Sequence, residues 1–503
     1  MKRIIQISGC CFIMLILLSA CAVSVPDTFT ESDENIKIYP DYSDVTIPYN
    51  IAPLNFRIEK EAGKYITSIA SESGNPVILK GKNININIKR WHQLLNNNKG
   101  KELSINIYLK ESGKWTKYKT IKNFIAPEPI DEYIAYRLIA PSFVVYRSHK
   151  IEQRNMTNFE TKDIYNNQAL NKKEDSQCIN CHAFQNYRTG NMQFHVRGMY
   201  GGTVILVDGK LKKMNLKTGN LISGGVYPAW HPVKKILAYS VNKTGQLFHS
   251  KDTQKVEVLD LASGLILYDA ETDKVSVILN DSNSLETFPA WSPDGKMLYF
   301  ASAYFPSASN KKEHSAHSLK NYQNIKYNIL RMPFDEETNT FGKPDTVFNA
   351  SKINKSATLP RVSPDGKYLL FTLGDYGTFH IWHQSSDLYA MNLQTGEEID
   401  FSLVNSPDVE SYHSWSSNGR WIIFSSRRDD GSYTRPYIAY IEENGKGRKP
   451  FILPQKNTNF YANLMLSFNI PEFMIEPVNT SVEDFAKVIK KDSIQAELIT
   501  NLQ

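Results

Sequence analysis

Residues 288–302 read FPAWSPDGKMLYFAS, and this stretch decides the fold. An aromatic residue and Pro-Ala-Trp lead into the turn Ser292–Gly295, after which apolar and polar side chains alternate. In such a turn proline presets φ at the second position, aspartate bonds back to the backbone, and glycine tolerates the positive φ that follows. The alternation is typical of a β-strand with one buried face. The stretch therefore predicts a tight turn followed by a strand.

The same pattern occurs three more times along the chain. The further copies are YPAWHPVKKILAYS (227–240), LPRVSPDGKYLLFT (359–372) and YHSWSSNGRWIIFSS (412–426). The anchors of the four copies are 61, 71 and 53 residues apart, at Trp230, Trp291, Val362 and Trp415. This spacing is typical of the blades of a β-propeller with outer loops of variable length.

Between the anchors lies a second repeated unit, a strand pair joined by a turn rich in Asp, Asn, Thr and Gly. It occurs as MNLKTG (214–219), LYDAETD (267–273), LYAMNLQTG (388–396) and YIEENG (440–445). Together the two units give four strands per blade. The motifs resemble the repeat of TolB-like propellers over roughly residues 178–477. The resemblance implies an all-β fold, although propellers of this type have many functions.

The blade count depends on both ends of the repeat region. Residues 178–219 fit the four-strand template, with CHAF as the leading segment. Residues 460–473 supply a leading segment and a second strand, and residues 143–163 look like a third and fourth strand. A ring closed by strands from both ends leaves no free edges. We therefore predict a six-bladed propeller over residues 131–477, closed by residues 131–170.

Two smaller regions flank the predicted propeller. Residues 36–130 contain alternating strands separated by Gly and Asn turns, which predicts a small β-sandwich that ends in a Pro-Glu-Pro linker at 127–129. Residues 478–503 have helical spacing, with Ser481 as a candidate N-cap.

The N-terminus has the form of a secretory leader. Lys2 and Arg3 precede an apolar run that ends in Leu-Ser-Ala-Cys21. This end resembles the bacterial lipobox, which implies a signal peptide over residues 1–20, lipidation of Cys21, a tether over residues 21–35 and a lipoprotein of the outer membrane that faces the periplasm. An ordinary signal peptide cut after Ala20 is the alternative. The net charge of +6 is small for 503 residues, so nothing favours a nucleic-acid partner.

Residues 178–182 read CINCH. The chain has five cysteines, and the two of this motif are those that remain when the leader and Cys21 are set aside. The motif resembles the C-x-x-C-H of c-type cytochromes. The resemblance implies haem c, with Cys178 and Cys181 in thioether bonds and His182 as the proximal iron ligand. Structural zinc lacks a fourth ligand here, and a redox dithiol or a disulfide remains as an alternative.

A haem held in this way needs a partner on its distal side. On the repeat template His182 aligns with Pro228, Pro289, Pro360 and His413, so the haem is expected near the centre of one face of the ring. We expect Arg197 to pair with a haem propionate. The candidates for the sixth iron ligand are His195 first, then Met192 or Met199, then a distant histidine such as His413 or His231.

Three classes of function are compatible with these features. The first is electron transfer or redox sensing by a membrane-anchored mono-haem protein, with the propeller as a docking scaffold for a periplasmic redox partner. The second is a protein-interaction scaffold with a structural haem. The third is a haem-dependent oxidoreductase such as a peroxidase. The Gly-x-Ser-x-Gly motif of serine hydrolases is missing from the sequence.

Overall fold

The computed structural model describes residues 23–140, 148–170, 178–251, 254, 256–305 and 320–499. The chain is an all-β protein with a few short helices. It divides into two compact units. Unit 1 comprises Met1–Pro127 and Pro454–Ala462, and unit 2 comprises Glu128–Leu453 and Asn463–Gln503. The predicted signal peptide and the predicted lipidation site at Cys21 lie outside the described residues.

In its described residues unit 1 contains two sheets, the helix α2 (Ile88–Asn96) and most of the short helix α4 (Phe460–Asn463). The larger sheet contains β1 (Thr30–Glu31), β3 (Thr46–Pro48), β5 (Lys64–Ala70), β6 (Val77–Lys80), β8 (Glu102–Glu111), β9 (Lys114–Lys117) and β10 (Ile121–Ala126). The smaller sheet contains β2 (Ile38–Tyr39), β4 (Phe56–Ile58) and β7 (Asn83–Ile84). Most of the strands expected from the alternating sequence are therefore present, but of the alternating run at residues 84–88 only Ile84 lies in a strand, β7.

Two features of unit 1 differ from the sequence interpretation. Residues 30–31, assigned to the tether, form β1 and pair in parallel with β9. Helix α2 (Ile88–Asn96) was not expected at all. It begins at Asn87, whose side chain accepts a hydrogen bond from the Arg90 amide, and its buried residues recur at the helical period, at Trp91, Leu94 and Leu95.

Unit 2 contains six sheets in its described residues, each named here by its innermost strand. The β14 sheet has β14 (Cys178–Gln185), β15 (Arg188–Arg197), β16 (Gly202–Val207) and β17 (Lys210–Asn215), and the β18 sheet has β18 (Val226–Trp230), β19 (Ile236–Phe248), β20 (Val256–Asp269) and β21 (Lys274–Leu279). The β22 sheet has β22 (Ser284–Trp291), β23 (Met297–Tyr304), β24 (Asn328–Asp335), β25 (Thr340–Phe341) and β26 (Asp345–Phe348), and the β27 sheet has β27 (Ser356–Val362), β28 (Tyr368–Gly374), β29 (Asp387–Asn392) and β30 (Glu398–Ile399). The β31 sheet has β31 (Glu410–Trp415), β32 (Trp421–Ser426), β33 (Arg435–Tyr440) and β34 (Phe451–Ile452), and the β35 sheet has β35 (Ser467–Met474), β11 (Tyr133–Ile139), β12 (Lys150–Asn155) and β13 (Thr161–Asn166).

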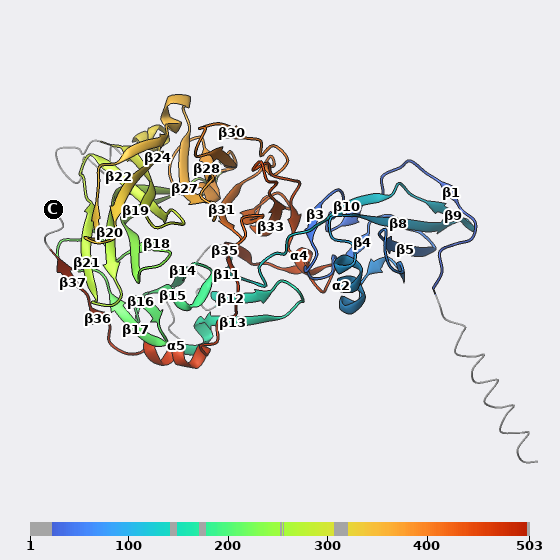
Figure 1. Ribbon diagram of the computed structural model, residues 1–503, viewed down its shortest axis with the longest axis horizontal. Helices are drawn as coiled ribbons and strands as arrows, with labels where there is room; N and C mark the ends of the chain where they lie inside the picture. Colours follow the sequence, from blue (N-terminus) through green and yellow to red (C-terminus); the bar gives the residue numbers. More distant parts are fainter. Residues whose placement is uncertain are drawn as a thin grey trace, which may run out of the picture. The chain divides into compact units, whose positions relative to one another are not determined.

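The innermost strands contact one another in a cyclic order: β14, β18, β22, β27, β31, β35 and β14 again. Figure 1 shows these sheets following one another around a common centre, with the strands β17 and β21 on the outside. Tryptophan anchors of the repeat link neighbouring sheets. The indole of Trp230 donates to the Ala183 carbonyl (3.3 Å), Trp291 to Ala229 (3.1 Å) and Trp415 to Arg361 (3.2 Å).

The β35 sheet joins the two ends of unit 2, as expected, but its strands are divided differently. The C-terminal part supplies one strand, β35, and the N-terminal part supplies three. Residues 460–463, expected in an extended leading segment, form the short helix α4 (Phe460–Asn463). Residues 143–147 of the expected outer strands lie outside the described residues.

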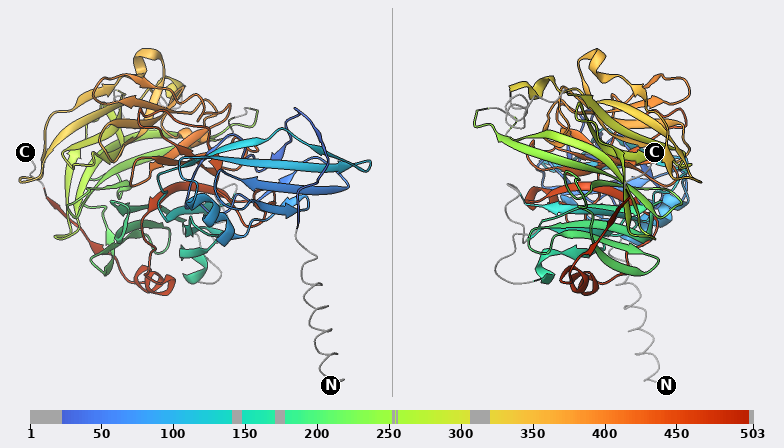
Figure 2. Two further views of the ribbon diagram at one scale, coloured as in Figure 1. Left: turned by 45° about the vertical axis from the view of Figure 1, so that its right-hand side comes forward. Right: turned by 90° about the vertical axis from the view of Figure 1, so that its left-hand side faces the viewer.

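The C-terminal segment is only partly helical. Helix α5 (Val482–Ile489) begins at Ser481, whose hydroxyl accepts from the Asp484 amide, so the predicted N-cap is confirmed. The chain then forms β36 (Ile494–Gln495) and β37 (Glu497–Ile499), which pair in parallel with β17 and β21. In both views of Figure 2 the red α5 lies at the outer edge of unit 2. The helix ends early because residues 494–499 complete the outer edges of two sheets.

Candidate functional site

The CINCH motif lies on β14, the innermost strand of its sheet. Cys178 is half-buried, lies opposite Arg197 in the pairing with β15 and is not bonded to Cys181 in a disulfide. Asn180 lies opposite His195. The expectation that the motif and His195 share one hairpin is therefore confirmed.

Cys181 occupies a β-bulge that recurs in all six sheets. The pairing register shifts between Asn180 and Ala183, and Cys181 has a left-handed φ of 53°. The same left-handed φ, between 47° and 56°, occurs once on every other innermost strand, at Tyr227, Phe288, Leu359, Tyr412 and Ile470. The residue that follows the left-handed one is His182 here, His413 on β31, and a proline on the other four strands. The predicted alignment of His182 with these prolines is confirmed.

The Cys181 thiol is enclosed, with only 6% of the residue exposed. Burial raises its pKa, although the nearby Arg197 and Arg137 guanidinium groups and the Tyr227 backbone act in the opposite direction. Burial raises the pKa of the Tyr239 and Tyr412 hydroxyls, and the nearby Cys181 adds to this shift. At neutral pH the thiol is therefore protonated, which is the form of a structural rather than a nucleophilic cysteine.

His182 is also buried, with 2% exposed. Burial, followed by the nearby Arg137 guanidinium, lowers the pKa of its imidazole to about 3, so the ring is neutral at physiological pH. Among the described residues neither ring nitrogen has a hydrogen-bond partner of normal geometry, although the Ile470 backbone lies nearby. A buried polar atom without a partner costs roughly 1–3 kcal/mol. This imidazole is therefore a neutral base with unused ligating capacity.

Arg137 of β11 connects the motif to the β35 sheet. One of its terminal nitrogens donates to the Ile179 carbonyl at 3.0 Å. Its charge also lowers the pKa of His149, which burial brings to about 4. His149 and His182 thus both lie beside Arg137, on the side of the β14 sheet that faces the β35 sheet.

The predicted sixth ligands occupy several different environments. The His195 Nδ1 hydrogen-bonds with the Thr203 hydroxyl at 2.8 Å, and its ring lies 5.9 Å from that of Tyr239, in the β18 sheet. In the described residues its Nε2 is buried without a partner. His195 and His182 therefore lie toward different neighbouring sheets. Met192 is fully buried in the apolar core that includes Phe194, whereas Met199 is 64% exposed.

The more distant histidines have structural roles. His231 fills the turn position that is serine in other copies, and its Nδ1 accepts from the amides of Val233 (3.2 Å) and Lys234 (2.9 Å). His413 of β31 lies with its Nε2 3.2 Å from the Leu370 carbonyl. Arg197, the predicted partner of a propionate, is exposed.

The donor set at the motif fits covalent haem in its chemistry. Two thiols flank the bulge, and the adjacent imidazole is neutral, buried and without a partner in the described part of the chain. A histidine that binds iron does so as the neutral imidazole. Because Cys181 and His182 are both buried, haem would have to be attached before β14 packs against its neighbours.

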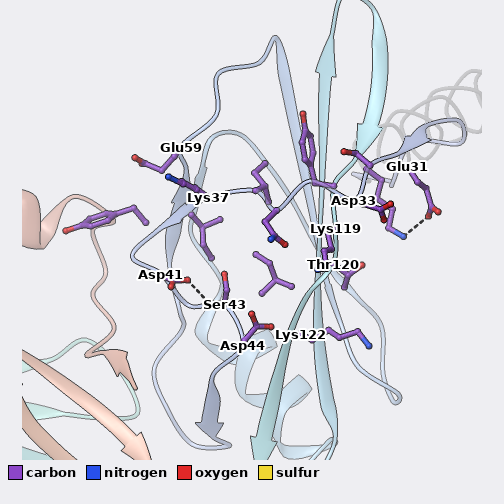
Figure 3. Close-up of a pocket in the computed structure, with 18 residues that line it drawn as sticks. Glu31, Asp33, Lys37, Asp41, Ser43, Asp44, Glu59, Lys119, Thr120 and Lys122 are labelled. Atoms are coloured by element: carbon purple, nitrogen blue, oxygen red, sulfur yellow. Dashed lines mark hydrogen bonds and ion pairs between the residues drawn. The ribbon is translucent and has the colours of Figure 1, made fainter. Parts of the chain in front are cut away.

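Unit 1 contains a separate cleft of about 860 Å³, shown in Figure 3. It lies between the N-terminal segment and the segment that joins β9 to β10. Its floor is apolar, and its wall carries both signs of charge, with an ion pair between Lys117 and Glu31 at 3.1 Å. The labelled charged side chains are Glu31, Asp33, Lys37, Asp41, Asp44, Glu59, Lys119 and Lys122. The mixture of charges favours no single class of ion.

Within the described residues the protein lacks two other kinds of feature. No three His, Cys, Asp or Glu side chains there form a metal-binding group. No helix there has the length and apolarity needed to cross a membrane.

Sequence reasoning missed several residues around the motif. The repeat alignment, which equates Cys181 with Tyr227 and Tyr412, had already predicted a position near the centre of one face of the ring for the motif. Arg137 and His149 come from a distant part of the chain and have no sequence signal. The charged cleft of unit 1 could not have been foreseen either, because it depends on how the segment before β2 crosses the larger sheet.

Comparisons with known proteins identify no family. A scan against models of protein families and a search of curated proteins both found no match to this chain. A search of solved structures found chains with low identity. One, from a study of two prolyl endopeptidases and their inter-domain dynamics, is 12% identical over 64% of this chain and 42% of its own length, with a TM-score of 0.33.

Two further solved structures are similar at the same level. Prolyl oligopeptidase B from Galerina marginata is 8% identical over 82% of this chain and 62% of its own length, with a TM-score of 0.30. A DUF4784 family protein from Bacteroides caccae is 9% identical over 75% of this chain and 98% of its own length, with a TM-score of 0.26. This chain thus spans less than two thirds of the length of both prolyl peptidases. None of these likenesses bears on its function.

Proposed function

We propose that unit 2 is a closed six-bladed propeller of the TolB-like type and that its first blade binds one haem c, for electron transfer or redox sensing. The cyclic contacts between innermost strands support the closed ring. The left-handed residue repeated on all six strands supports six equivalent blades. Unit 1 is proposed to be a small β-sandwich that carries the propeller.

The observation that carries the haem assignment is the imidazole of His182. Four of the six blades have proline at this position, which needs no polar partner. His182 instead places two ring nitrogens in the interior without a partner in the described residues, at the position directly after Cys181 in the chain. An arrangement that costs stability is explained if the imidazole binds a ligand.

Each residue of the motif has a role in this proposal. Cys178 and Cys181 hold the haem in thioether bonds, and His182 binds the iron, which supplies a one-electron redox centre. Burial keeps His182 neutral and therefore able to ligate. Arg137 fixes the β14 backbone through the Ile179 carbonyl, and the tyrosines around Cys181 exclude water.

The sixth ligand is proposed to be a histidine, and two positions qualify. His195, the sequence-based candidate, keeps an unpartnered Nε2 within the described residues, but it lies toward the β18 sheet. His149 lies beside Arg137 on the same side as His182. Two histidine ligands leave no open iron position, which favours electron transfer over peroxidase chemistry.

The cellular setting is proposed from the leader. Acylation of Cys21 would anchor the protein at the outer membrane, facing the periplasm, because two or three acyl chains bind a bilayer stably. A periplasmic redox protein is the proposed partner, with the exposed Arg197 available to a haem propionate. Nucleic acid is not proposed, in line with the small net charge.

The test is to express the full chain in a bacterial host that matures c-type cytochromes. We expect the mass of the mature protein to include one haem, and the reduced protein to show a sharp α band. His182→Pro should keep the fold, because four blades have proline there, and should retain covalent haem with an altered α band. His413→Pro changes the same position of another blade and should leave the spectrum unchanged.

Carbon monoxide separates the remaining alternatives. A spectrum that does not respond supports electron transfer, whereas rapid binding would show an open site and support a peroxidase. A purified chain with only its polypeptide mass would refute the haem assignment. The protein-interaction scaffold would then be the remaining proposal for unit 2.

A further inference from the structure

The cleft of unit 1 opens at a gap in the edge of the larger sheet. Strands β9 and β10 follow one another along β8, and the N-terminal segment covers their outer edge at two places. Strand β1 pairs with Thr116 and Lys117, and β3 pairs with residues 124–126. Between these two places residues 32–45 leave the larger sheet and contribute β2 to the smaller one. Residues 118–123 therefore have no pairing strand on their outer side among the described residues.

The backbone groups of Lys122 point into this gap. In an antiparallel ladder, successive residues direct their backbone groups alternately toward the partner strand and away from it. The Ile125 amide donates to the Lys101 carbonyl on the β8 side at 2.9 Å. The Phe124 amide donates in the opposite direction, to the Val45 carbonyl at 3.0 Å. Lys122 lies two residues before Phe124, so its amide and carbonyl also point outward, where no described group bonds to them.

A second free edge, that of β2, faces the same gap. This strand lies at the end of the smaller sheet, next to β4. The Glu59 amide donates to the Lys37 carbonyl at 2.9 Å, so Lys37 faces β4 and Ile38 directs its backbone groups to the other side. Figure 3 shows Lys37 on one side of the cleft and Thr120 and Lys122 on the other. Two strand edges thus lie across the cleft from each other.

The lining of the cleft is that of two strand edges. Consecutive residues contribute to each wall, 35–39 on one side and 117–122 on the other. A wall formed by the face of a strand would be lined by alternate residues, because successive side chains point to opposite faces. The cleft volume of about 860 Å³ lies within the range of roughly 300–1,000 Å³ that is usual for ligand sites. The cleft therefore has room for an extended chain between its two edges.

Side chains along the cleft alternate between buried isoleucine and exposed lysine. Ile36 and Ile38 of one wall are each 6% exposed, and Ile121 of the other wall is 7% exposed. Lys37 and Lys122, which are their neighbours in the chain, are exposed. A strand added at either edge would direct its own side chains alternately in the same two directions. A segment in which apolar and polar residues alternate therefore fits the cleft.

We propose that this cleft binds an extended peptide segment of another protein, in which apolar and polar residues alternate, and that the segment pairs with β10 at Lys122. When a peptide adds a strand to a free sheet edge, backbone hydrogen bonds give affinity and alternate side chains give specificity. Charged side chains of both signs surround the cleft, so the unpaired backbone groups rather than net charge define the ligand. This site lies within unit 1 and is independent of the haem proposal.

The experiment uses the full chain and three fluorescent peptides as probes. In each peptide threonine alternates with one apolar residue, which is valine, leucine or phenylalanine, and a terminal lysine and a terminal glutamate keep the peptide soluble. We expect saturable binding of at least one peptide, measured by fluorescence anisotropy. Hydrogen exchange of the Lys122 amide should slow at least tenfold when that peptide is bound, because the amide then donates to the peptide.

Two matched changes separate backbone pairing from side-chain contact. Lys122→Pro removes the outward amide, and an edge strand tolerates proline where its N–H faces outward. We expect this variant to bind the peptide at least tenfold more weakly, whereas Lys122→Ala keeps the amide and should bind it as wild type does. Methylation of the backbone nitrogens of the peptide removes its donors and keeps its side chains. It should weaken binding to the wild-type chain by a similar factor.

Equal binding by wild type and Lys122→Pro, or of the peptide and its N-methylated form, would overturn the proposal. The same conclusion would follow if none of the three peptides bound at millimolar concentration. A dimer of the free chain that Lys122→Pro dissociates would show that a second copy occupies the edge, and would overturn the assignment to a segment of another protein.

Discussion

At the residue scale, one position of the repeat separates structural from functional side chains. The residue after each left-handed residue is proline on four innermost strands and histidine on two. Proline suits the position because it fixes φ and has no polar side chain to satisfy. His413 is buried with its Nε2 near the Leu370 carbonyl. Replacing His413 therefore tests how a buried histidine changes the free energy of unfolding of this fold.

We expect His413→Pro to reduce the sensitivity of the fold to acid. Burial, followed by Arg361, lowers the pKa of His413 to about 3, so the unfolded chain binds a proton that the folded chain does not. Stability contributed by this group is complete above pH 6.5 and is lost as the pH falls toward 3. The loss amounts to roughly 3 kcal/mol near pH 4.

The measurement is urea unfolding of wild type and His413→Pro at pH 7 and at pH 4. Relative to wild type, the free energy of unfolding of the variant should be higher at pH 4 than it is at pH 7. An equal difference at both values would show that His413 keeps a normal pKa in the folded protein.

At the scale of the element, the turns of the four repeat copies share one hydrogen-bond position. The Ser416 hydroxyl accepts from the Trp421 amide at 3.0 Å, and Ser292 and Ser363 accept from Met297 and Tyr368 in the same way (both 2.9 Å). In the remaining turn a histidine, His231, accepts from two amides instead. In the three serine copies, the sequence motif thus supplies a side-chain oxygen that accepts a hydrogen bond from the first amide of the second strand.

We expect Ser416→Ala to destabilise unit 2 by roughly 1–3 kcal/mol, because it leaves the buried Trp421 amide without its acceptor. Chemical denaturation followed by tryptophan fluorescence measures this change. Ser432→Ala, in an exposed loop, is the control and should change stability by less than about 0.5 kcal/mol. Equal effects of the two substitutions would contradict the role assigned to the hydroxyl.

At the scale of the whole molecule, the β35 sheet ties residues 133–166 to the end of the chain. Strand β35 pairs with β11 on one side and contacts β31 and β14 on the other. Its side chains Phe473 and Met474 are fully buried. Without this strand β11 would present a long unpaired edge, which promotes aggregation.

We expect a chain that ends at Ala462 to lose cooperative unfolding of unit 2, because it lacks β35. Truncating a buried Phe alone costs roughly 3–5 kcal/mol, a large part of the 5–15 kcal/mol that stabilises a typical domain. A chain that ends at Asp492 keeps β35 and α5 and loses only β36 and β37. This longer chain should unfold cooperatively, with a modestly lower midpoint in urea. A similar urea unfolding curve for the chain that ends at Ala462 would show that β35 is dispensable.

Much of the architecture follows from the sequence alone. The four anchored repeats and the SPDG turns determine local strand and turn structure, because φ preferences and alternating burial act over a few residues. The template therefore aligned Cys181 and His182 correctly with the other innermost strands. The N-cap at Ser481 could be predicted for the same reason, because capping depends only on residues within one turn of the helix start.

The tertiary structure alone decided which distant segments meet. The division of the β35 sheet into one strand and three and the Arg137–Ile179 contact beside CINCH both join residues far apart in sequence. Such contacts are selected by packing and by the desolvation of charge, which act only once the sheets assemble. The local sequence pattern thus determined which residues form strands and turns, and packing determined which groups surround each buried side chain.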